Sequence, residues 1–252
     1  MSILTRDGVK IYYEVHGQGP ALLLTHGYSS TSHMWAGQVE LLARNHTLIL
    51  WDMRGHGKSD YPTDPAAYSE AATVADMAAL LDVARAPSAI IGGLSLGGYM
   101  SLAFHLAHPG RTRALLIIDT GPGYRSDAAR DSWNANAHKT AERFEKEGLT
   151  GLAGGRADVN RTKHRDASGL ALAARGMLAQ RDARVINSLP SIAVPALVVV
   201  GANDTPFLNA SDYMVAKIPG AKKVIIPNAG HAANIDQPAL FNDALTAFLN
   251  NV

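Results

Sequence analysis

The sequence contains no cysteine among its 252 residues, which excludes disulfides, thiol nucleophiles and thiolate metal sites. Charge of one sign is not in excess either, because 23 Lys and Arg residues nearly balance 22 Asp and Glu residues, for a net charge of +1. Nucleic acid or an anionic membrane would therefore find no basic surface to bind. No apolar run approaches the roughly 20 residues that span a bilayer. We expect the partner to be a small molecule.

The first residues of the sequence do not contain a basic segment followed by an apolar stretch, so no signal peptide is predicted. The lack of cysteine suits a reducing compartment, and we predict a cytoplasmic location. At 47% hydrophobic residues the chain is rich enough in apolar side chains to bury the core of one large α/β domain. Nothing in the sequence indicates an oligomeric state.

Short aliphatic runs alternate with helical patterns along the chain. Residues 2–5 and 9–15 flank Asp7-Gly8 and predict a hairpin, because Asp-Gly tolerates the positive φ angles of a tight turn. Continuous apolar runs predict strands covered on both faces, as in parallel sheets, and they lie at 21–25, 47–52, 88–93, 114–119, 196–201 and 223–227. Helical patterns separate them at 34–44, 70–84, 96–107, 207–217 and 238–250. This alternation predicts an α/β fold with an eight-stranded, mostly parallel sheet and helices on both faces.

One interval departs from this alternation. Between Asp119 and Pro195 about seventy residues carry no convincing strand, while residues 126–147 and 166–182 have helical patterns. We expect a single domain whose core comprises 1–120 and 190–252, with a helical lid inserted at approximately 121–189.

A serine stands between glycines where a predicted strand meets a predicted helix. Gly93-Leu94-Ser95-Leu96-Gly97 fits the pattern G-x-S-x-G, which places a nucleophilic serine on a strained strand-to-helix turn. The helix N-terminus there favours negative charge. Gly93 and Gly97 are expected to leave room for the backbone at the turn, and Gly98 is expected to let the helix approach the sheet. Gly92 has no expected role. The alternative is a glycine-rich turn with an incidental serine.

A serine hydroxyl needs a base to remove its proton, so a histidine is required. His231 follows the last predicted strand on the short loop Asn228-Ala229-Gly230, and we predict that it is this base rather than a structural loop histidine. His26 is expected to be a structural hydrogen-bonding residue. Histidines in or beside helical and lid stretches are expected to face solvent for the most part, and these are His46, His105, His108, His138 and His164.

A carboxylate should hold the histidine in the correct tautomer. Asp204 and Asp119 both end predicted strands, and both satisfy the chain order serine, acid, histidine. Asp204 is favoured because its strand immediately precedes that of His231. Asp119 opens the predicted lid, where it could instead cap the following segment.

Attack on a carbonyl also requires donors for the oxygen that becomes negative. The backbone N–H groups of Leu96, after the serine, and of Tyr28, in the loop after strand 21–25, are the predicted donors. Tyr28, Leu96 and Trp133 are the predicted substrate-binding side chains. No cofactor is expected. No metal is expected either, because the spacing of His26, Asp52 and His56 along the chain does not match that of a metal-binding motif. Gly57-Lys58-Ser59 is not a phosphate-binding loop, since Asp52 stands where that loop requires glycine.

Four motifs together resemble the α/β-hydrolase superfamily, within its group of small esterases, lactonases and carbon–carbon hydrolases. They are HGYSS (26–30), DMRGHGKSD (52–60), GLSLGG (93–98) and GANDTP with NAGH (201–206 and 228–231). The resemblance implies hydrolysis of an ester or lactone of a small, largely apolar substrate through an acyl-serine. It also implies that the loop 52–60 braces the oxyanion region, with Arg54 structural. Serine at the turn excludes the dehalogenases and epoxide hydrolases of this fold, which carry aspartate there.

Two alternatives remain open at the level of sequence. Carbon–carbon hydrolases of ring-cleavage products share the same three residues, and a hydrolase-like small-molecule receptor could keep them with little turnover. The substrate is not determined by the sequence. Four lid arginines could recognise a carboxylate or could simply be solvated, and these are Arg156, Arg161, Arg165 and Arg175.

Overall fold

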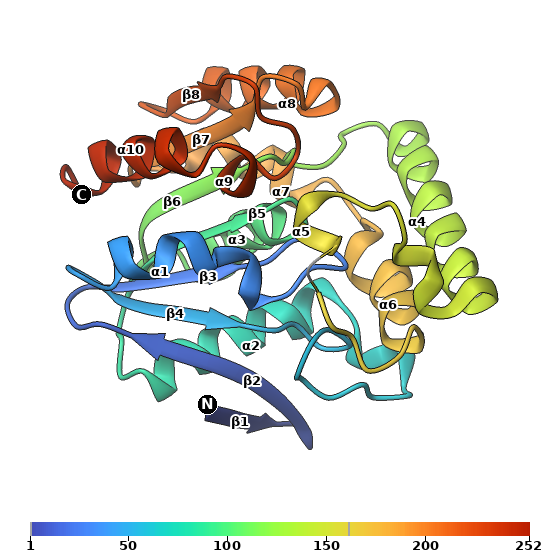
Figure 1. The fold of residues 1–252 in the computed structure, drawn as a ribbon. Helices are drawn as coiled ribbons and strands as arrows, with labels where there is room; N and C mark the ends of the chain where they lie inside the picture. The colour runs from blue at the N-terminus through green and yellow to red at the C-terminus, as the bar shows by residue number, and fades with distance from the viewer. Residues whose placement is uncertain (1, 161) are drawn as a thin grey trace.

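The computed structural model describes residues 2–160 and 162–252, which form an eight-stranded sheet with helices on both faces (Figure 1). The strand order is β1-β2-β4-β3-β5-β6-β7-β8. β1 and β2 form the predicted hairpin, β2 pairs antiparallel with β4, and the remaining neighbours are parallel. The predicted fold is therefore confirmed. The strands are β1 (Ser2–Arg6), β2 (Val9–His16), β3 (Ala21–Thr25), β4 (Thr47–Trp51), β5 (Ala89–Leu94), β6 (Thr112–Ile118), β7 (Ala196–Gly201) and β8 (Lys222–Ile226).

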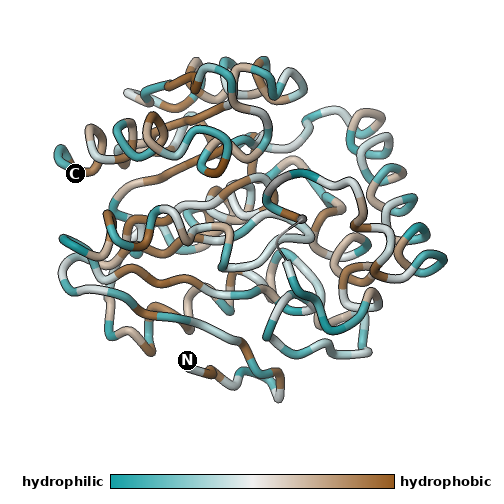
Figure 2. Tube along the Cα trace, viewed as in Figure 1, coloured by the Kyte–Doolittle hydropathy of each residue, from teal (hydrophilic) through white to brown (hydrophobic). Residues whose placement is uncertain are grey.

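Apolar side chains cover both faces of the central strands, which appear brown in Figure 2. In β3, Leu23 packs into one hydrophobic cluster while Leu22 and Leu24 pack into the other. Successive side chains of a strand point to opposite faces, so a strand buried on both sides must be apolar at every position. One cluster includes residues of α2 (Glu70–Val83), α3 (Leu96–Ala107) and α8 (Thr205–Lys217), and the other includes residues of α1 (Ala36–Leu42) and α10 (Pro238–Leu249).

A helical segment fills the interval between β6 and β7, as the sequence predicts. Its longest helix begins after Ser126, whose hydroxyl accepts a hydrogen bond from the Ala129 N–H. Ala137, Ala141 and Phe144 form the buried face of this helix. Figure 1 shows α4 and α6 side by side, beyond one end of the sheet. The helices of this segment are α4 (Asp127–Glu147), α5 (Ala157–Asn160), α6 (Ser168–Ala173) and α7 (Arg184–Ser188), and a short α9 (Ala233–Asp236) precedes α10.

No helix within residues 2–160 and 162–252 has the length and apolar character needed to cross a membrane.

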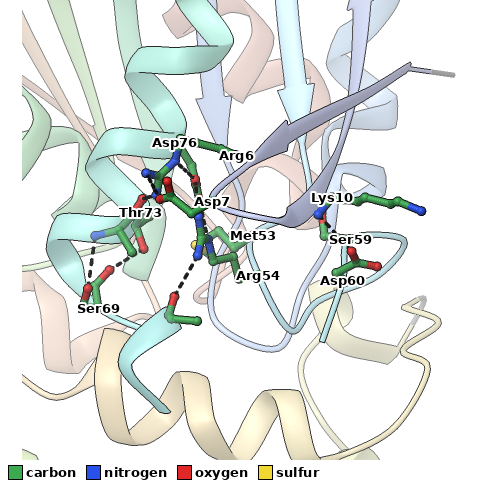
Figure 3. A network of polar contacts seen from close by, with 12 residues as sticks. Arg6, Asp7, Lys10, Met53, Arg54, Ser59, Asp60, Ser69, Thr73 and Asp76 are labelled. Carbon is green, nitrogen blue, oxygen red and sulfur yellow. Dashed lines mark hydrogen bonds and ion pairs between the residues drawn. The ribbon is translucent and has the colours of Figure 1, made fainter. Parts of the chain in front are cut away.

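A buried ion pair anchors the loop after β4 to α2 (Figure 3). The Arg54 guanidinium donates from Nε and Nη2 to the two Asp76 carboxylate oxygens, at 2.7 and 2.9 Å. Arg54 is 3% exposed and Asp76 is fully buried. Arg6 of β1 also donates to Asp76 and to the Ala72 carbonyl. The expectation that Arg54 is structural agrees with these contacts.

Asp76→Asn is expected to lower the free energy of unfolding by about 3–5 kcal/mol, because it leaves the Arg54 charge buried without its partner. Chemical denaturation would measure this change. Asp82→Asn is the matched control, since Asp82 is largely exposed and pairs with Arg111 at the surface. That control should cost no more than about 1 kcal/mol. Equal losses in the two variants would contradict a structural role for the buried pair.

Candidate active site

Ser95 lies on a strained turn between β5 and α3. Its φ of 56° and ψ of −117° are unusual for a non-glycine residue. The glycines on either side have no room for a side chain: a Cβ on Gly97 would lie 2.2 Å from the Thr25 carbonyl oxygen. A Cβ on Gly93 would lie 2.5 Å from the Gly97 carbonyl carbon. The two glycines therefore let the turn close against the end of β3.

The other two glycines of this stretch allow packing against neighbouring strands. A Cβ on Gly98 would lie 2.6 Å from Thr120 Cγ2, just beyond β6, so glycine lets α3 approach the sheet. A Cβ on Gly92 would lie 2.7 Å from Leu116 Cβ and 3.0 Å from Leu24 Cδ2. Gly92 thus leaves space for leucines of the two strands that flank β5, a role that the sequence alone does not indicate.

Asp204 and His231 lie together at the ends of β7 and β8. His231 Nδ1 is 2.8 Å from Asp204 Oδ2, and both side chains are at least nine-tenths buried. β7 and β8 are parallel neighbours, so the loops that follow them start at the same edge. The Asn203 N–H donates to the Ala229 carbonyl at 2.8 Å and joins the two loops. Among the described residues, the Ser95 hydroxyl forms no hydrogen bond, and in unliganded sites such bonds are often loose.

The Asp119 carboxylate, the alternative acid, is bonded to backbone rather than to the histidine. Its Oδ1 accepts from the Gly201 N–H at 2.7 Å and its Oδ2 from the Ala233 N–H at 3.3 Å. Burial raises the pKa of the Asp119 carboxyl well above its usual range, and the nearby charge and hydrogen bonding of Asp204 add to this shift. Asp119 does not cap α4, whose N-cap is Ser126. The Asp119 carboxylate instead connects the end of β7 to the segment after His231 through these two hydrogen bonds.

The loop after β3 lies against the serine turn. A Cβ on Gly27 would be 3.5 Å from Ser95 Cβ. Among the described residues, the Tyr28 N–H has no hydrogen-bond acceptor, and the Leu96 N–H belongs to the first turn of α3, where such groups lack a helical partner. Both predicted donor residues therefore have an N–H group without a partner in the described part of the chain, and Gly27, which precedes Tyr28, lies against Ser95.

Three histidines, of which His26 and His56 are fully buried and His164 is partly buried, form a cluster behind this loop, and each accepts a hydrogen bond from a backbone N–H. His26 Nε2 accepts from Met53, His56 Nε2 from Ser29 and His164 Nδ1 from Gly57, at 2.9, 3.2 and 3.1 Å. The rings lie 5.0 Å (His26 to His56) and 5.7 Å (His56 to His164) apart. The loop 52–60 and the helical segment are thus attached to the Tyr28 loop through neutral imidazoles.

The expectation that the helix and lid histidines mostly face solvent is wrong. Of the five named, His138 is exposed, His105 is buried, and the remaining three are partly buried. Tertiary packing decides this, because His164 reaches from the helical segment to the Ser29 carbonyl of the distant β3 loop.

Acidification is expected to destabilise the fold through this cluster. Burial lowers the pKa of His26 to about 4, although the charges of Asp52 and Asp158 oppose the shift, and burial also lowers the pKa of His56 and His164. Below pH 6.5 the unfolded chain binds protons that the native chain does not. The free energy of unfolding therefore falls as the pH drops below 6.5. His26 contributes about 1.4 kcal/mol per pH unit down to its pKa of about 4, and His56 and His164 contribute in the same direction.

Denaturation at several pH values between 7.5 and 4.5 measures this slope. His164→Gln should reduce the slope, since one of the three titrating groups is removed. His138→Gln, on the exposed surface of α4, serves as the control and should leave the slope unchanged. Identical slopes in the parent and the His164 variant would contradict the account.

A cavity of about 150 Å³ opens beside Ser95, between the strand ends and the helical segment. Leu96 and Trp133 line it, as predicted for substrate contact, whereas Tyr28 does not. The Tyr28 hydroxyl donates to the Leu170 carbonyl at 2.8 Å, and its ring packs edge-on to Phe144. The remaining lining residues are Tyr99, Thr120, Gly121, Pro122, Gly123, Tyr124, Leu178, Gln180, Pro206, Phe207 and Ala210.

Sequence reasoning missed Phe207 and Gln180. The Phe207 ring lies 5.0 Å from the His231 ring and also lines the cavity with Ser95, which brings the histidine to the same site. Its position three residues after Asp204 was the available signal. Gln180 carried no signal, because the helical segment has no motif that predicts which residues face inward.

Of the four arginines considered for carboxylate recognition, the three that the structure describes do not line this cavity. Arg156 pairs with Asp158, Arg175 with Glu145, and Arg165 donates to the Ser59 carbonyl. Arg161 lies outside the described residues. In the part of the chain that the structure describes, no three His, Asp or Glu side chains gather as metal ligands would.

Comparison with known proteins identifies the family of this chain. The chain matches the Alpha/beta hydrolase family over residues 22–244. It is 26% identical to a putative 2-succinyl-6-hydroxy-2,4-cyclohexadiene-1-carboxylate synthase of Bacillus subtilis, covering 100% of this chain and 99% of that protein. It is 28% identical to 3-oxoadipate enol-lactonase 2 of Acinetobacter baylyi, over 98% and 95% of the two chains. The solved structure of a thermophilic esterase from Thermogutta terrifontis matches with a TM-score of 0.82 and 27% identity, over 98% and 96%.

The family match spans most of the chain, so the chain belongs to the α/β-hydrolase family. This confirms the family resemblance carried by the four motifs, and the lactonase and esterase named above are similar to this chain over nearly its whole length.

Proposed function

We propose that the protein hydrolyses a carboxylic ester or lactone of a small, largely apolar substrate through an acyl-enzyme on Ser95. The observation that carries the proposal is the buried Asp204–His231 pair at the sheet edge where the strained serine also lies, together with the unpaired N–H groups of Tyr28 and Leu96. The esterase and enol-lactonase relatives support the same reaction class.

Each group has a distinct role in the proposed reaction. Asp204 accepts the His231 Nδ1–H and so leaves the Nε2 lone pair free to remove the Ser95 proton. Ser95 Oγ attacks the carbonyl carbon, and the resulting oxyanion accepts hydrogen bonds from the N–H groups of Tyr28 and Leu96. His231 then protonates the leaving alcohol oxygen. Water, deprotonated by His231, attacks the acyl-serine and releases the acid.

The helical segment between β6 and β7 acts as the lid of this site in the proposal. Trp133 and Leu178 come from it and form part of the cavity wall. The Trp133 Nε1–H donates to the Leu178 carbonyl at 2.8 Å, which fixes the indole in place. An apolar wall suits the acyl or alcohol group of a small ester, and it removes water from around the developing charge.

An active-site label tests the proposal directly. A fluorophosphonate should phosphonylate Ser95 as fluoride departs and His231 takes the serine proton, and tandem mass spectrometry should locate the adduct on that residue. The parent should also turn over a short p-nitrophenyl ester. An adduct on another serine would contradict the assignment.

The same experiment separates the two alternative functions. Labelling without turnover of any ester or lactone would favour the carbon–carbon hydrolase, for which a ring-cleavage product is then the substrate to assay. Binding of esters with neither labelling nor turnover would favour the receptor.

A further inference from the structure

Gln180 lines the cavity beside Ser95, and its side-chain oxygen has no hydrogen-bond partner among the described residues. Gln180 is 8% exposed, and its Oε1 is buried and unpaired. Oε1 lies against another cavity residue, since a Cβ on Gly123 would be 2.9 Å from it. Buried side-chain amides are nearly always hydrogen-bonded, because leaving one unpaired costs about 1–3 kcal/mol. A ligand that pairs with this amide would remove that cost.

The backbone of Gln180 is held in place from α4. The Asn134 side chain accepts from the Gln180 N–H at 2.7 Å and donates to the Gln180 carbonyl at 2.8 Å. These two bonds fix where the Gln180 side chain leaves the main chain. Its position in the cavity wall is thus built into the fold rather than left to a mobile loop.

The described residues of the rest of the wall carry no positive charge. Apolar and aromatic side chains dominate it, and none of the described residues lining it is Lys or Arg. Behind the wall, the Tyr99 hydroxyl donates to the Glu70 carboxylate at 2.9 Å. A carboxylate entering this cavity would lose its hydration without gaining a cation, which is strongly unfavourable.

We propose that the Gln180 amide binds an uncharged hydrogen-bonding group of the substrate, and that the substrate is a neutral ester or lactone carrying such a group. A secondary amide fits best, because it offers one donor and one acceptor to match those of the glutamine. This inference rests on the proposed function of the same site. It separates the protein from the relative whose named product carries a carboxylate.

Three p-nitrophenyl esters of similar length test the proposal: the N-acetylglycine ester, the pentanoate, and the succinate half-ester. Gln180→Met should lower kcat/KM for the N-acetylglycine ester about tenfold, the value of one hydrogen bond. The same variant should raise kcat/KM for the pentanoate, since an apolar side chain of similar length replaces an unpaired amide. The parent should use the succinate half-ester at least about tenfold less well than the pentanoate.

Gln18→Met is the matched control, because Gln18 is exposed in the loop before β3 and should change none of the three rates. Equal changes for the N-acetylglycine ester and the pentanoate in Gln180→Met, or a parent that prefers the succinate half-ester, would overturn the proposal. The ester-hydrolase function would still stand in that case, provided that turnover depends on Ser95.

Binding decides the Gln180 contact if no ester is turned over. Calorimetric titration of Ser95→Ala and of Ser95→Ala with Gln180→Met, using the N-acetylglycine ester and the pentanoate, compares the two affinities without hydrolysis. A selective loss for the N-acetylglycine ester supports the contact even when the hydrolase function fails. Unchanged relative affinities would overturn it.

Discussion

Ser95→Ala is expected to lower kcat for a short p-nitrophenyl ester by about 10⁶-fold, the scale seen when a serine nucleophile is removed. The hydroxyl is the group that forms the acyl-enzyme, so no other residue of the site can take its place. The residual rate would come from binding and from the two N–H donors alone. Steady-state and single-turnover kinetics on purified protein measure the effect.

Ser191→Ala is the control for this variant, because Ser191 is exposed and its hydroxyl donates only to the Ser188 carbonyl. Its kcat should equal that of the parent. The loss at position 95 should also leave the thermal midpoint close to the parent value, since the hydroxyl makes no hydrogen bond among the described residues. Turnover that survives in Ser95→Ala would refute the nucleophile assignment.

Asp204→Asn is expected to lower kcat by about 10⁴-fold. The Asp204 carboxylate accepts the Nδ1–H of His231 at 2.8 Å, whereas an amide can turn its NH₂ toward the ring. The histidine would then carry its proton on Nε2 and could no longer remove the proton of Ser95. Measurement of kcat across pH distinguishes this loss of the base from a loss of folding.

Asp119→Asn is the comparison that makes the test specific. Both Asp119 carboxylate oxygens accept from backbone N–H groups rather than from the histidine, and an amide of the same shape keeps one of these two contacts. The variant weakens one backbone contact and should lower kcat less than about tenfold, the scale of a single neutral hydrogen bond. A severe loss at 119 together with a mild loss at 204 would exchange the roles of the two acids.

Local sequence patterns were sufficient for the sheet and for the serine turn. Continuous apolar runs predicted the two-faced burial of β3, β5, β6 and β7, because their shortness and their alternation with helical patterns favour buried parallel strands. The glycines around Ser95 predicted the turn because only glycine fits where backbones come so close. Chain order and strand adjacency also favoured Asp204, which the structure places on His231.

Tertiary structure alone decided the roles of Gly92, His164 and Gln180. Gly92 makes room for Leu24 and Leu116, which belong to two other strands. His164 and Gln180 belong to a helical segment whose inward face depends on packing against α4 and the β3 loop. The spacing of apolar residues predicts that a side chain is buried, but it does not predict which residues that side chain contacts. Contacts between residues far apart in sequence leave no local pattern. The candidate reacting groups could therefore be proposed from the sequence, whereas the composition of the cavity wall required the folded chain.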